Sequence, residues 1–140
     1  MENLNFVVLD TDILIGLLRG KEDIVQLVKS LEDNNAIFLT TAINEFELYF
    51  GAYKSKFKDA NIKAVHNLLQ KLEVVPFVHP ATEIAGRIYS ELSKKGQPLE
   101  IRDLFIASIT LSVNAILVTH NKKHFTRITG LKIYSEENGL

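Results

Sequence analysis

The chain has 140 residues, of which 46% are hydrophobic and 24% are charged. This length and apolar content suit one compact domain and exclude an intrinsically disordered protein. The chain contains no cysteine, so disulfide bonds and thiolate metal sites are excluded. A metal ion would be held by carboxylates, amides or histidines, and hard oxygen ligands favour Mg²⁺ or Mn²⁺ over Zn²⁺.

The charges are nearly balanced, with 16 Lys and Arg against 17 Asp and Glu. Nucleic-acid-binding domains are often basic, because phosphate neutralisation supplies much of their affinity. A nucleic-acid site here is therefore a local basic patch, or the protein is an enzyme that holds RNA weakly and briefly. Residues 1–5 lack the features of a signal peptide, and no apolar run approaches the roughly 20 residues of a membrane span. We expect a cytoplasmic protein with no membrane segment.

Five short apolar segments are expected to form strands, and helical patterns separate them. Most of the five do not alternate polar and apolar residues, which is typical of strands buried on both faces. Strands that alternate with helices predict an α/β domain over residues 1–140, with a parallel sheet between helices. The expected strands are 6–9, 37–41, 74–77, 115–119 and 132–134, and the expected helices are 13–18, one from about 43, 62–72, 84–92 and 101–113.

Asp10 and Asp12 stand between the first strand and the first helix. A carboxylate there can cap the free amides of the helix start, and we expect Asp12 to do so. Asp10 is the last strand residue, which is too early for a good cap, so we predict a functional role for it. In parallel sheets, functional groups gather beyond the carboxyl ends of the strands.

Glu45 and Glu47 lie near the start of the helix that begins around residue 43, and an aromatic stripe follows them. Two positions along a helix are about 200° apart, so both cannot face one site. Gly51 lies one turn after Glu47, and its missing side chain would let another segment approach, which favours Glu47. The stripe comprises Phe46, Phe50, Tyr53 and Phe57, and core packing is the expected role for most of it.

Asp103 is the only carboxylate in the apolar stretch 101–113. An ionised carboxylate out of water costs several kcal/mol unless a cation or donor meets it. Interaction with the helix dipole or capping is an alternative, which Glu100 would serve equally well. Two such isolated acids, Asp10 and Asp103, favour a divalent metal between them.

Thr119 and Asn121 follow the fourth expected strand. A hydroxyl and an amide there can hold a metal-bound water or a neighbouring carboxylate, or they can cap a short turn. His120 and His124 have the spacing of a helical zinc pair, but no acidic helix motif accompanies them. Basic residues that could receive an RNA backbone at the rim of such a site are Arg19, Lys21, Arg102, Lys122 and Lys123.

Taken together and in order, these motifs resemble PIN-domain proteins, and more narrowly VapC-type toxins of toxin–antitoxin pairs. The resemblance runs from about residue 6 to residue 134. It rests on the segments 9–15, 47–52, 96–107 and 117–125, which read LDTDILI, ELYFGA, GQPLEIRDLFIA and LVTHNKKHF. The combination is far more specific than any one of the four.

The resemblance implies a three-layer α/β/α PIN-like fold with about five parallel strands and a Mg²⁺- or Mn²⁺-dependent endoribonuclease site. Asp10, Glu47 and Asp103 fall on the acidic, metal-binding positions of the family. Asn121 stands where many PIN domains carry a fourth Asp, which weakens the case for a second tightly bound metal. Supporting hydroxyls are implied at Thr11 and Thr119. Family members commonly form homodimers and pair with a small antitoxin.

Three alternatives stay open at this stage. One is a PIN-domain nuclease that processes RNA outside any toxin–antitoxin pair, and another is a catalytically silent PIN scaffold. The third is a receiver-like signalling domain, which is also parallel α/β with acidic metal ligands. A receiver needs an Asp at the end of a central strand, and the third expected strand provides none.

Overall fold

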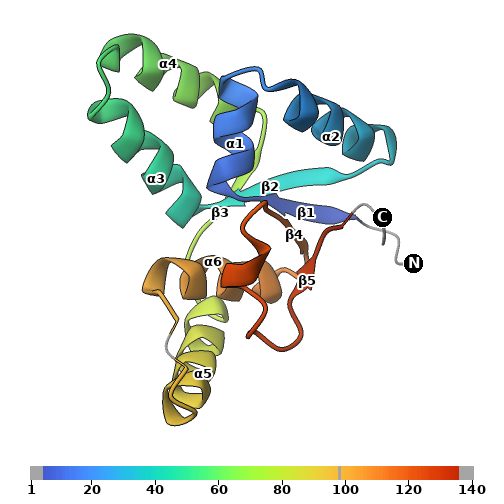
Figure 1. The fold of residues 1–140 in the computed structure, drawn as a ribbon, viewed down its shortest axis with the longest axis vertical. Coiled ribbons are helices and arrows are strands. Elements are labelled where there is room, and N and C mark those ends of the chain that lie inside the picture. Colours follow the sequence, from blue (N-terminus) through green and yellow to red (C-terminus); the bar gives the residue numbers. More distant parts are fainter. Residues whose placement is uncertain (1–4, 98, 136–140) are drawn as a thin grey trace.

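The computed structural model describes residues 5–97 and 99–135. Residues 1–4 lie outside the described residues. They are most of the segment 1–5, for which the sequence predicted no signal peptide. Pro98, which belongs to the motif at 96–107, also lies outside the described residues. Figure 1 shows a central sheet with helices on both faces.

Five parallel strands form one sheet in the order β3-β2-β1-β4-β5. The predicted number and direction of the strands are confirmed. The strands are β1 (Phe6–Leu9), β2 (Ile37–Thr41), β3 (Glu73–Val75), β4 (Ile116–Val118) and β5 (Lys132–Ile133). A receiver-like domain has the order 2-1-3-4-5, with its third strand inside the sheet. Here β3 is an edge strand, so that alternative is wrong.

Helices cover the sheet on both faces, which gives three layers. The helices are α1 (Thr11–Leu18), α2 (Glu22–Asp33), α3 (Ala42–Tyr53), α4 (Lys58–Leu69), α5 (Ala81–Lys94) and α6 (Ile101–Ser112), with a 3₁₀ turn η1 (Lys122–His124). In Figure 1, α1 to α4 lie on one side of the sheet and α5 and α6 on the other. This three-layer arrangement agrees with the expected PIN-like fold.

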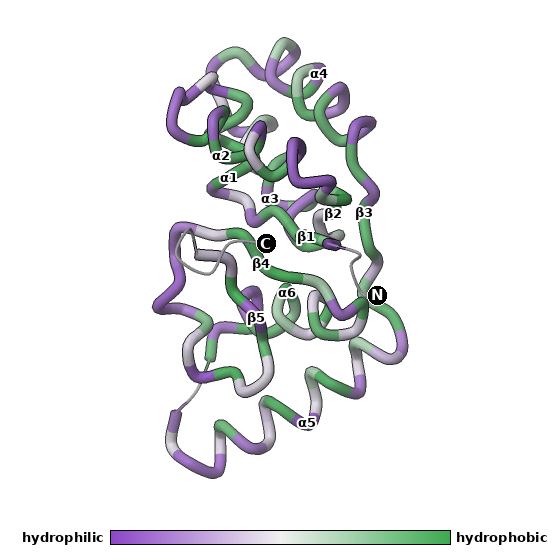
Figure 2. Tube along the Cα trace, turned by 90° about the vertical axis from the view of Figure 1, so that its right-hand side faces the viewer, coloured by the Kyte–Doolittle hydropathy of each residue, from purple (hydrophilic) through white to green (hydrophobic). Residues whose placement is uncertain are grey.

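The strands supply apolar side chains to both layers, as the non-alternating patterns predicted. Val7 and Leu9 pack with α1 to α4, whereas Val8 packs with α5 and α6. Figure 2 shows hydrophobic residues along the central strands and alternating hydropathy along α5, as expected for a helix with one solvated face. No helix within the described ranges is long and apolar enough to cross a bilayer.

Two glycines have different roles from those the sequence suggested. A Cβ at Gly51 would meet no atom within 4 Å, so the expected close approach of another segment is wrong. The close approach occurs at Gly16 instead, where a Cβ would lie 2.1 Å from Cδ1 of Ile24. Gly16 therefore lets α1 and α2 pack in contact.

The aromatic stripe is exposed, which corrects the expectation that most of it packs in the core. Phe46, Phe50, Tyr53 and Phe57 are 64%, 55%, 61% and 66% exposed. The core side of α3 is formed by Leu48 and Ala52 instead. Phe57 lies beyond the end of α3, so the stripe does not belong to one helix. The four side chains are exposed, and the rings of Phe46 and Phe50 stack with their centroids 6.1 Å apart.

Candidate active site

The site lies where the strand order reverses. β1 pairs with β2 on one side and with β4 on the other, and Asp10 and Thr119 follow β1 and β4 directly. A crevice opens at the carboxyl ends of parallel strands at such a switch point. The topology thus brings these two residues together, although 109 positions separate them.

Asp10 is fully buried and serves as the N-cap of α1. Its Oδ1 accepts hydrogen bonds from the Thr11 amide at 2.8 Å and from Asn44 Nδ2 at 2.9 Å. Its Oδ2 accepts one from the Thr119 hydroxyl at 2.7 Å. The expectation that Asp10 comes too early to cap is wrong, because the helix begins at Thr11, immediately after it. Asp10 therefore both caps α1 and places its carboxylate at the carboxyl end of β1.

Asn44 is a member of the cluster that sequence reasoning missed. Its side chain is fully buried, and Nδ2 donates both to Asp10 and, at 2.9 Å, to the Thr11 hydroxyl. Its Oδ1 accepts from the Thr41 hydroxyl at 2.7 Å, within the capping box that starts α3. The pair Thr41 and Asn44 has the spacing of a capping box, which would have indicated a helix start but not the contact with Asp10.

Glu47 reaches the cluster from α3. Its Oε1 accepts a hydrogen bond from the Thr11 hydroxyl at 2.5 Å, and its side chain is 24% exposed. The side chain of Glu45 makes no hydrogen bond or ion pair within the described part of the chain. The structure therefore brings Glu47, and not Glu45, to the Asp10 side of the helix, although the Gly51 argument that favoured it fails.

Asp103 approaches from the first turn of α6 and is 3% exposed. Its Oδ2 lies 3.5 Å from Nδ1 of His124. The N-cap of α6 is Glu100, whose side chain makes no capping bond, and Asp103 faces the cluster rather than the helix amides. Burial raises the pKa of the Asp103 carboxyl, while the neighbouring Arg102 and His124 act in the opposite direction.

Arg102 lies among the carboxylates, which corrects its predicted place at the rim. Its Nη2 donates to Asp10 Oδ1 at 3.0 Å, its Nε to Glu47 Oε2 and its Nη1 to Asp103 Oδ1. Burial lowers the pKa of the guanidinium, but the Glu47 hydrogen bond and the nearby acids outweigh it and raise that pKa overall. One cation thus pairs with three carboxylates that come from three separate elements.

Asp12 links α1 to the loop after β4. Its Oδ1 accepts from the Ile13 amide and its Oδ2 from the His120 amide, both at 2.8 Å. Asp12 lies in the first turn and is not the N-cap, so its predicted capping role is wrong. Burial raises the pKa of the Asp12 carboxyl, against the effect of these amide bonds.

Thr119 is buried, whereas Asn121 is exposed. The Thr119 hydroxyl donates a hydrogen bond to Asp10 and accepts one from the backbone N–H of Asn121 at 3.0 Å. The Asn121 side chain makes no hydrogen bond within residues 5–97 and 99–135. Of the six predicted site residues, the structure joins Asp10, Thr11, Glu47, Asp103 and Thr119 in one contact network, and Asn121 enters it only through its backbone.

Comparison with known proteins agrees with this fold and cluster. The family model described as PIN domain matches residues 7–131. The chain belongs to the PIN-domain family. It is 35% identical over 128 residues to "Ribonuclease VapC1" of Haemophilus influenzae, covering 89% of this chain and 92% of that one. It is 31% identical to "tRNA(fMet)-specific endonuclease VapC" of Salmonella typhimurium, covering 89% and 93%.

A solved structure of VapBC2 from Rickettsia felis, bound to a DNA fragment from its promoter, is similar over most of its length. The TM-score is 0.85 at 31% identity, covering 92% of this chain and 97% of that one. These similarities place the chain with the VapC branch of PIN-domain proteins, as the motifs indicated.

The side chains of this PIN domain suit a divalent metal by their chemistry. Asp10, Glu47 and Asp103 offer hard oxygen atoms that already converge on one positive group. As they stand, no three Asp, Glu or His side chains in the described residues are grouped closely enough to hold a metal ion directly. A guanidinium is wider than Mg²⁺ and holds the three carboxylates farther apart. The donor set therefore fits, provided that the carboxylates close in.

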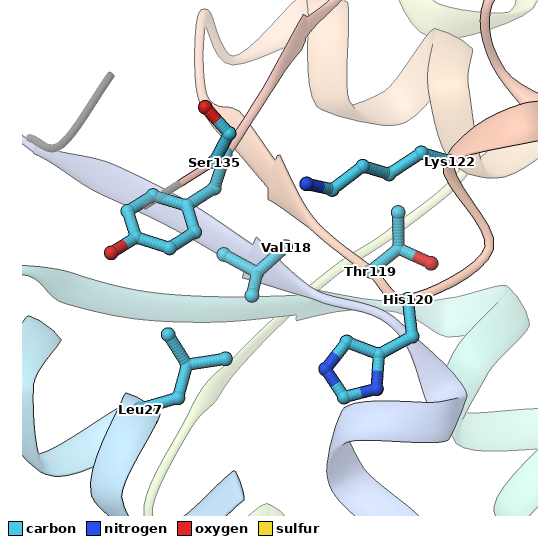
Figure 3. A pocket seen from close by; sticks show the side chains of 7 residues that line it. Leu27, Val118, Thr119, His120, Lys122 and Ser135 are labelled. Carbon is cyan, nitrogen blue, oxygen red and sulfur yellow. The ribbon is translucent and has the colours of Figure 1, made fainter. Parts of the chain in front are cut away.

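Thr119 also lines a cavity of about 450 Å³, which none of the three clustered carboxylates lines. Figure 3 shows Lys122, Thr119 and His120 on one side of it and Ser135 across from them. His120 lies before η1 and His124 ends it, so the two histidines do not have the helical spacing that a zinc pair requires. The remaining predicted rim residues, Arg19, Lys21, Lys122 and Lys123, are exposed.

Proposed function

We propose that this chain is a Mg²⁺-dependent endoribonuclease, for which Mn²⁺ can substitute, and the toxin of a type II toxin–antitoxin pair. The observation that carries the proposal is the convergence of Asp10, Glu47 and Asp103 on one cation at the switch point of the sheet. The names of the similar proteins, a ribonuclease and a tRNA endonuclease, support RNA as the substrate.

Asp10, Glu47 and Asp103 would hold the metal, whose chemistry when bound is Lewis acidity and a lowered pKa of water. The neighbours keep those carboxylates in place. Thr119 and Asn44 fix the two oxygens of Asp10, and the Thr11 hydroxyl fixes Glu47. Such neighbouring bonds set the orientation and basicity of metal ligands.

Asn121 is the least constrained member of the proposed site. Its side chain is exposed and neutral, where many PIN domains have a fourth Asp. A neutral amide is a weaker ligand for a hard cation than a carboxylate, so we propose one tightly held metal ion rather than two. Attack by water would leave a 5′-phosphate on one product, unlike metal-free cleavage through the 2′-hydroxyl.

We propose a VapB-like antitoxin and a second copy of the chain as protein partners. The support is the solved VapBC complexes of similar chains and the exposed rings of Phe46, Phe50 and Tyr53. A groove of about 350 Å³ is lined by residues of α1, α3 and α4, and Glu47 is among them. We propose that residues 1–140 form one domain. Because the proposed substrate is RNA, we also propose that the protein acts in the cytoplasm.

The test is cleavage of total RNA by the antitoxin-free chain with Mg²⁺, with Mn²⁺ and with EDTA. Asp10→Asn and Asp103→Asn should each abolish cleavage while circular dichroism shows a folded protein. Asp33→Asn is the matched control, because Asp33 is exposed at the end of α2. Cleavage that survives EDTA and both site substitutions would refute the proposal.

Two related functions make different predictions in the same assay. A silent PIN scaffold would cut no RNA under any metal condition, although a narrow RNA target has to be excluded with a broader substrate panel. A PIN nuclease outside a toxin–antitoxin pair would cut RNA but bind no small antitoxin. Whether a small gene lies just upstream of this one distinguishes the latter case cheaply.

A further inference from the structure

Arg102 offsets part of the negative charge of the carboxylate cluster from within the chain. Its three guanidinium nitrogens each contact a different acid: Asp10, Glu47 and Asp103. The Asp10 and Asp103 side chains are 0% and 4% exposed, so unpaired charges there would be strongly disfavoured. A single residue, adjacent to Asp103 in the first turn of α6, thus supplies positive charge to a site assembled from three elements.

We propose that Arg102 is an internal competitor of the divalent metal, and that the metal binds by displacing its guanidinium from the three carboxylates. The inference rests on the proposed function, because it assumes that these carboxylates are the metal ligands. The guanidinium and the metal would use the same oxygens, among them Asp10 Oδ1, Glu47 Oε2 and Asp103 Oδ1. Both cannot occupy the cluster at once.

The side chain has a path out of the cluster. Arg102 is 29% exposed, so part of its guanidinium or stem already meets solvent. Rotation of the long side chain moves the charge while the α6 backbone stays in place. The bonds from Thr119 and Asn44 to Asp10, and from Thr11 to Glu47, do not involve Arg102 and would keep the carboxylates oriented during the exchange.

Displacement has a measurable consequence for metal affinity. The apparent affinity of a ligand falls by the fraction of molecules whose site is open to it. If Arg102 occupies the cluster in nine of ten molecules, removing it tightens the apparent Kd about tenfold. Arg102→Gln shortens the side chain and removes its charge, so we expect it to bind Mn²⁺ about tenfold more tightly or better.

The experiment is calorimetric titration of Mn²⁺ into the full chain, prepared without antitoxin and freed of metal. Arg87→Gln is the matched control, because Arg87 pairs with Glu91 on the solvated face of α5. Lys122→Gln controls for the general loss of one positive charge, since Lys122 is exposed on η1. Both controls should bind Mn²⁺ within about twofold of the original chain, because neither opens the cluster.

A second measurement is made on the original chain. The Arg102 Nε–H group is held against Glu47, so its ¹⁵N–¹H resonance should exchange slowly with water. Saturation with Mg²⁺, which is diamagnetic, should shift that resonance and remove its protection. Arg102→Lys serves only to assign the signal. A resonance that stays unchanged at saturating Mg²⁺ would overturn the inference, even if Arg102→Gln fails to fold.

Asp103→Asn separates the two proposals. Loss of Mn²⁺ binding in Asp103→Asn, with tighter binding in Arg102→Gln, supports both. Loss of Mn²⁺ binding in Asp103→Asn, with Mn²⁺ binding by Arg102→Gln that is equal to or weaker than that of the original chain, refutes only the role of Arg102. The role of Arg102 is also refuted if Lys122→Gln tightens Mn²⁺ binding as much as Arg102→Gln does. Binding that Asp103→Asn leaves unchanged refutes the ligand set itself, and the inference about Arg102 with it.

Discussion

Asn44→Asp tests whether the buried amide is essential to the carboxylate cluster. In the structure Nδ2 of Asn44 donates to Asp10 and to the hydroxyl of Thr11, each at 2.9 Å. The substitution replaces this donor with a carboxylate oxygen of nearly the same shape. It removes two hydrogen bonds and brings a second negative charge against Asp10, where both side chains are fully buried.

The size of the effect follows from those two bonds. A hydrogen bond to a charged group contributes about 1.5–3 kcal/mol, and a neutral one about 0.5–1.5 kcal/mol. Their loss alone predicts a destabilisation of about 2–4.5 kcal/mol, before any repulsion between the two carboxylates. For a domain with a typical stability of about 5–15 kcal/mol, this is a large fraction.

The destabilisation should also depend on pH. Two carboxylates in contact raise the pKa of the pair in the folded state, so the folded variant binds a proton more tightly than the unfolded one. The variant therefore loses stability relative to the original chain as pH rises above the ordinary carboxyl range near 4. Below that range both carboxyls are protonated in either state, and the penalty should be smallest.

Urea unfolding in EDTA, followed by circular dichroism between pH 4 and pH 7, measures both quantities. EDTA matters because a bound metal would offset the added negative charge. The control is Asn61→Asp, since the Asn61 side chain is exposed and, within the part of the chain that the structure describes, bonds only to Ser55 Oγ. A change below about 1 kcal/mol for Asn44→Asp, with no trend in pH, would refute the reasoning about the amide.

Three further predictions concern other parts of the molecule. Gly16→Ala should destabilise the fold by about 1–3 kcal/mol, because the new Cβ would overlap Ile24. Gly51→Ala should be neutral or stabilise the fold by up to about 1 kcal/mol, and urea unfolding compares the two variants. Phe50→Ser should leave the unfolding free energy within about 0.5 kcal/mol but weaken assembly in analytical ultracentrifugation, and unchanged assembly would contradict the role of the aromatic surface. The folded-state pKa of Asp12 is raised, so the stability of the original chain relative to Asp12→Asn should fall as pH rises above 3.8; a flat difference would contradict this.

The architecture could be predicted because it rests on repeated local signals. Strands buried on both faces have no alternating pattern, and the runs at 6–9 and 37–41 agree with β1 and β2 residue for residue. The ends of the other three strands differ by one or two residues, as at β3, where pairing with β2 decides the limits. The aromatic stripe was misjudged because helical spacing identifies one face of a helix but not whether that face meets the core.

The site could be predicted only in part, for a related reason. Isolated acids such as Asp10 and Asp103 stand out among apolar neighbours in the sequence, so the local sequence pattern alone identifies them. Asn44 and Arg102 do not stand out, because an amide in a helix start and an arginine beside an acid are ordinary at the surface. Their roles depend on contacts across 34 and 92 positions, which no local pattern encodes.

The same contacts explain how a domain of net charge −1 keeps three acids together. Asp10 alone receives hydrogen bonds from an amide group, a hydroxyl, a backbone N–H and a guanidinium, so its charge is met from four directions. Three of those donors are neutral and fix geometry, while Arg102 supplies the compensating charge. Geometry and charge compensation are therefore carried by different residues, and the cation can be exchanged without dismantling the scaffold that orients Asp10. A site built this way can stay assembled whether its cation is a side chain or a metal ion.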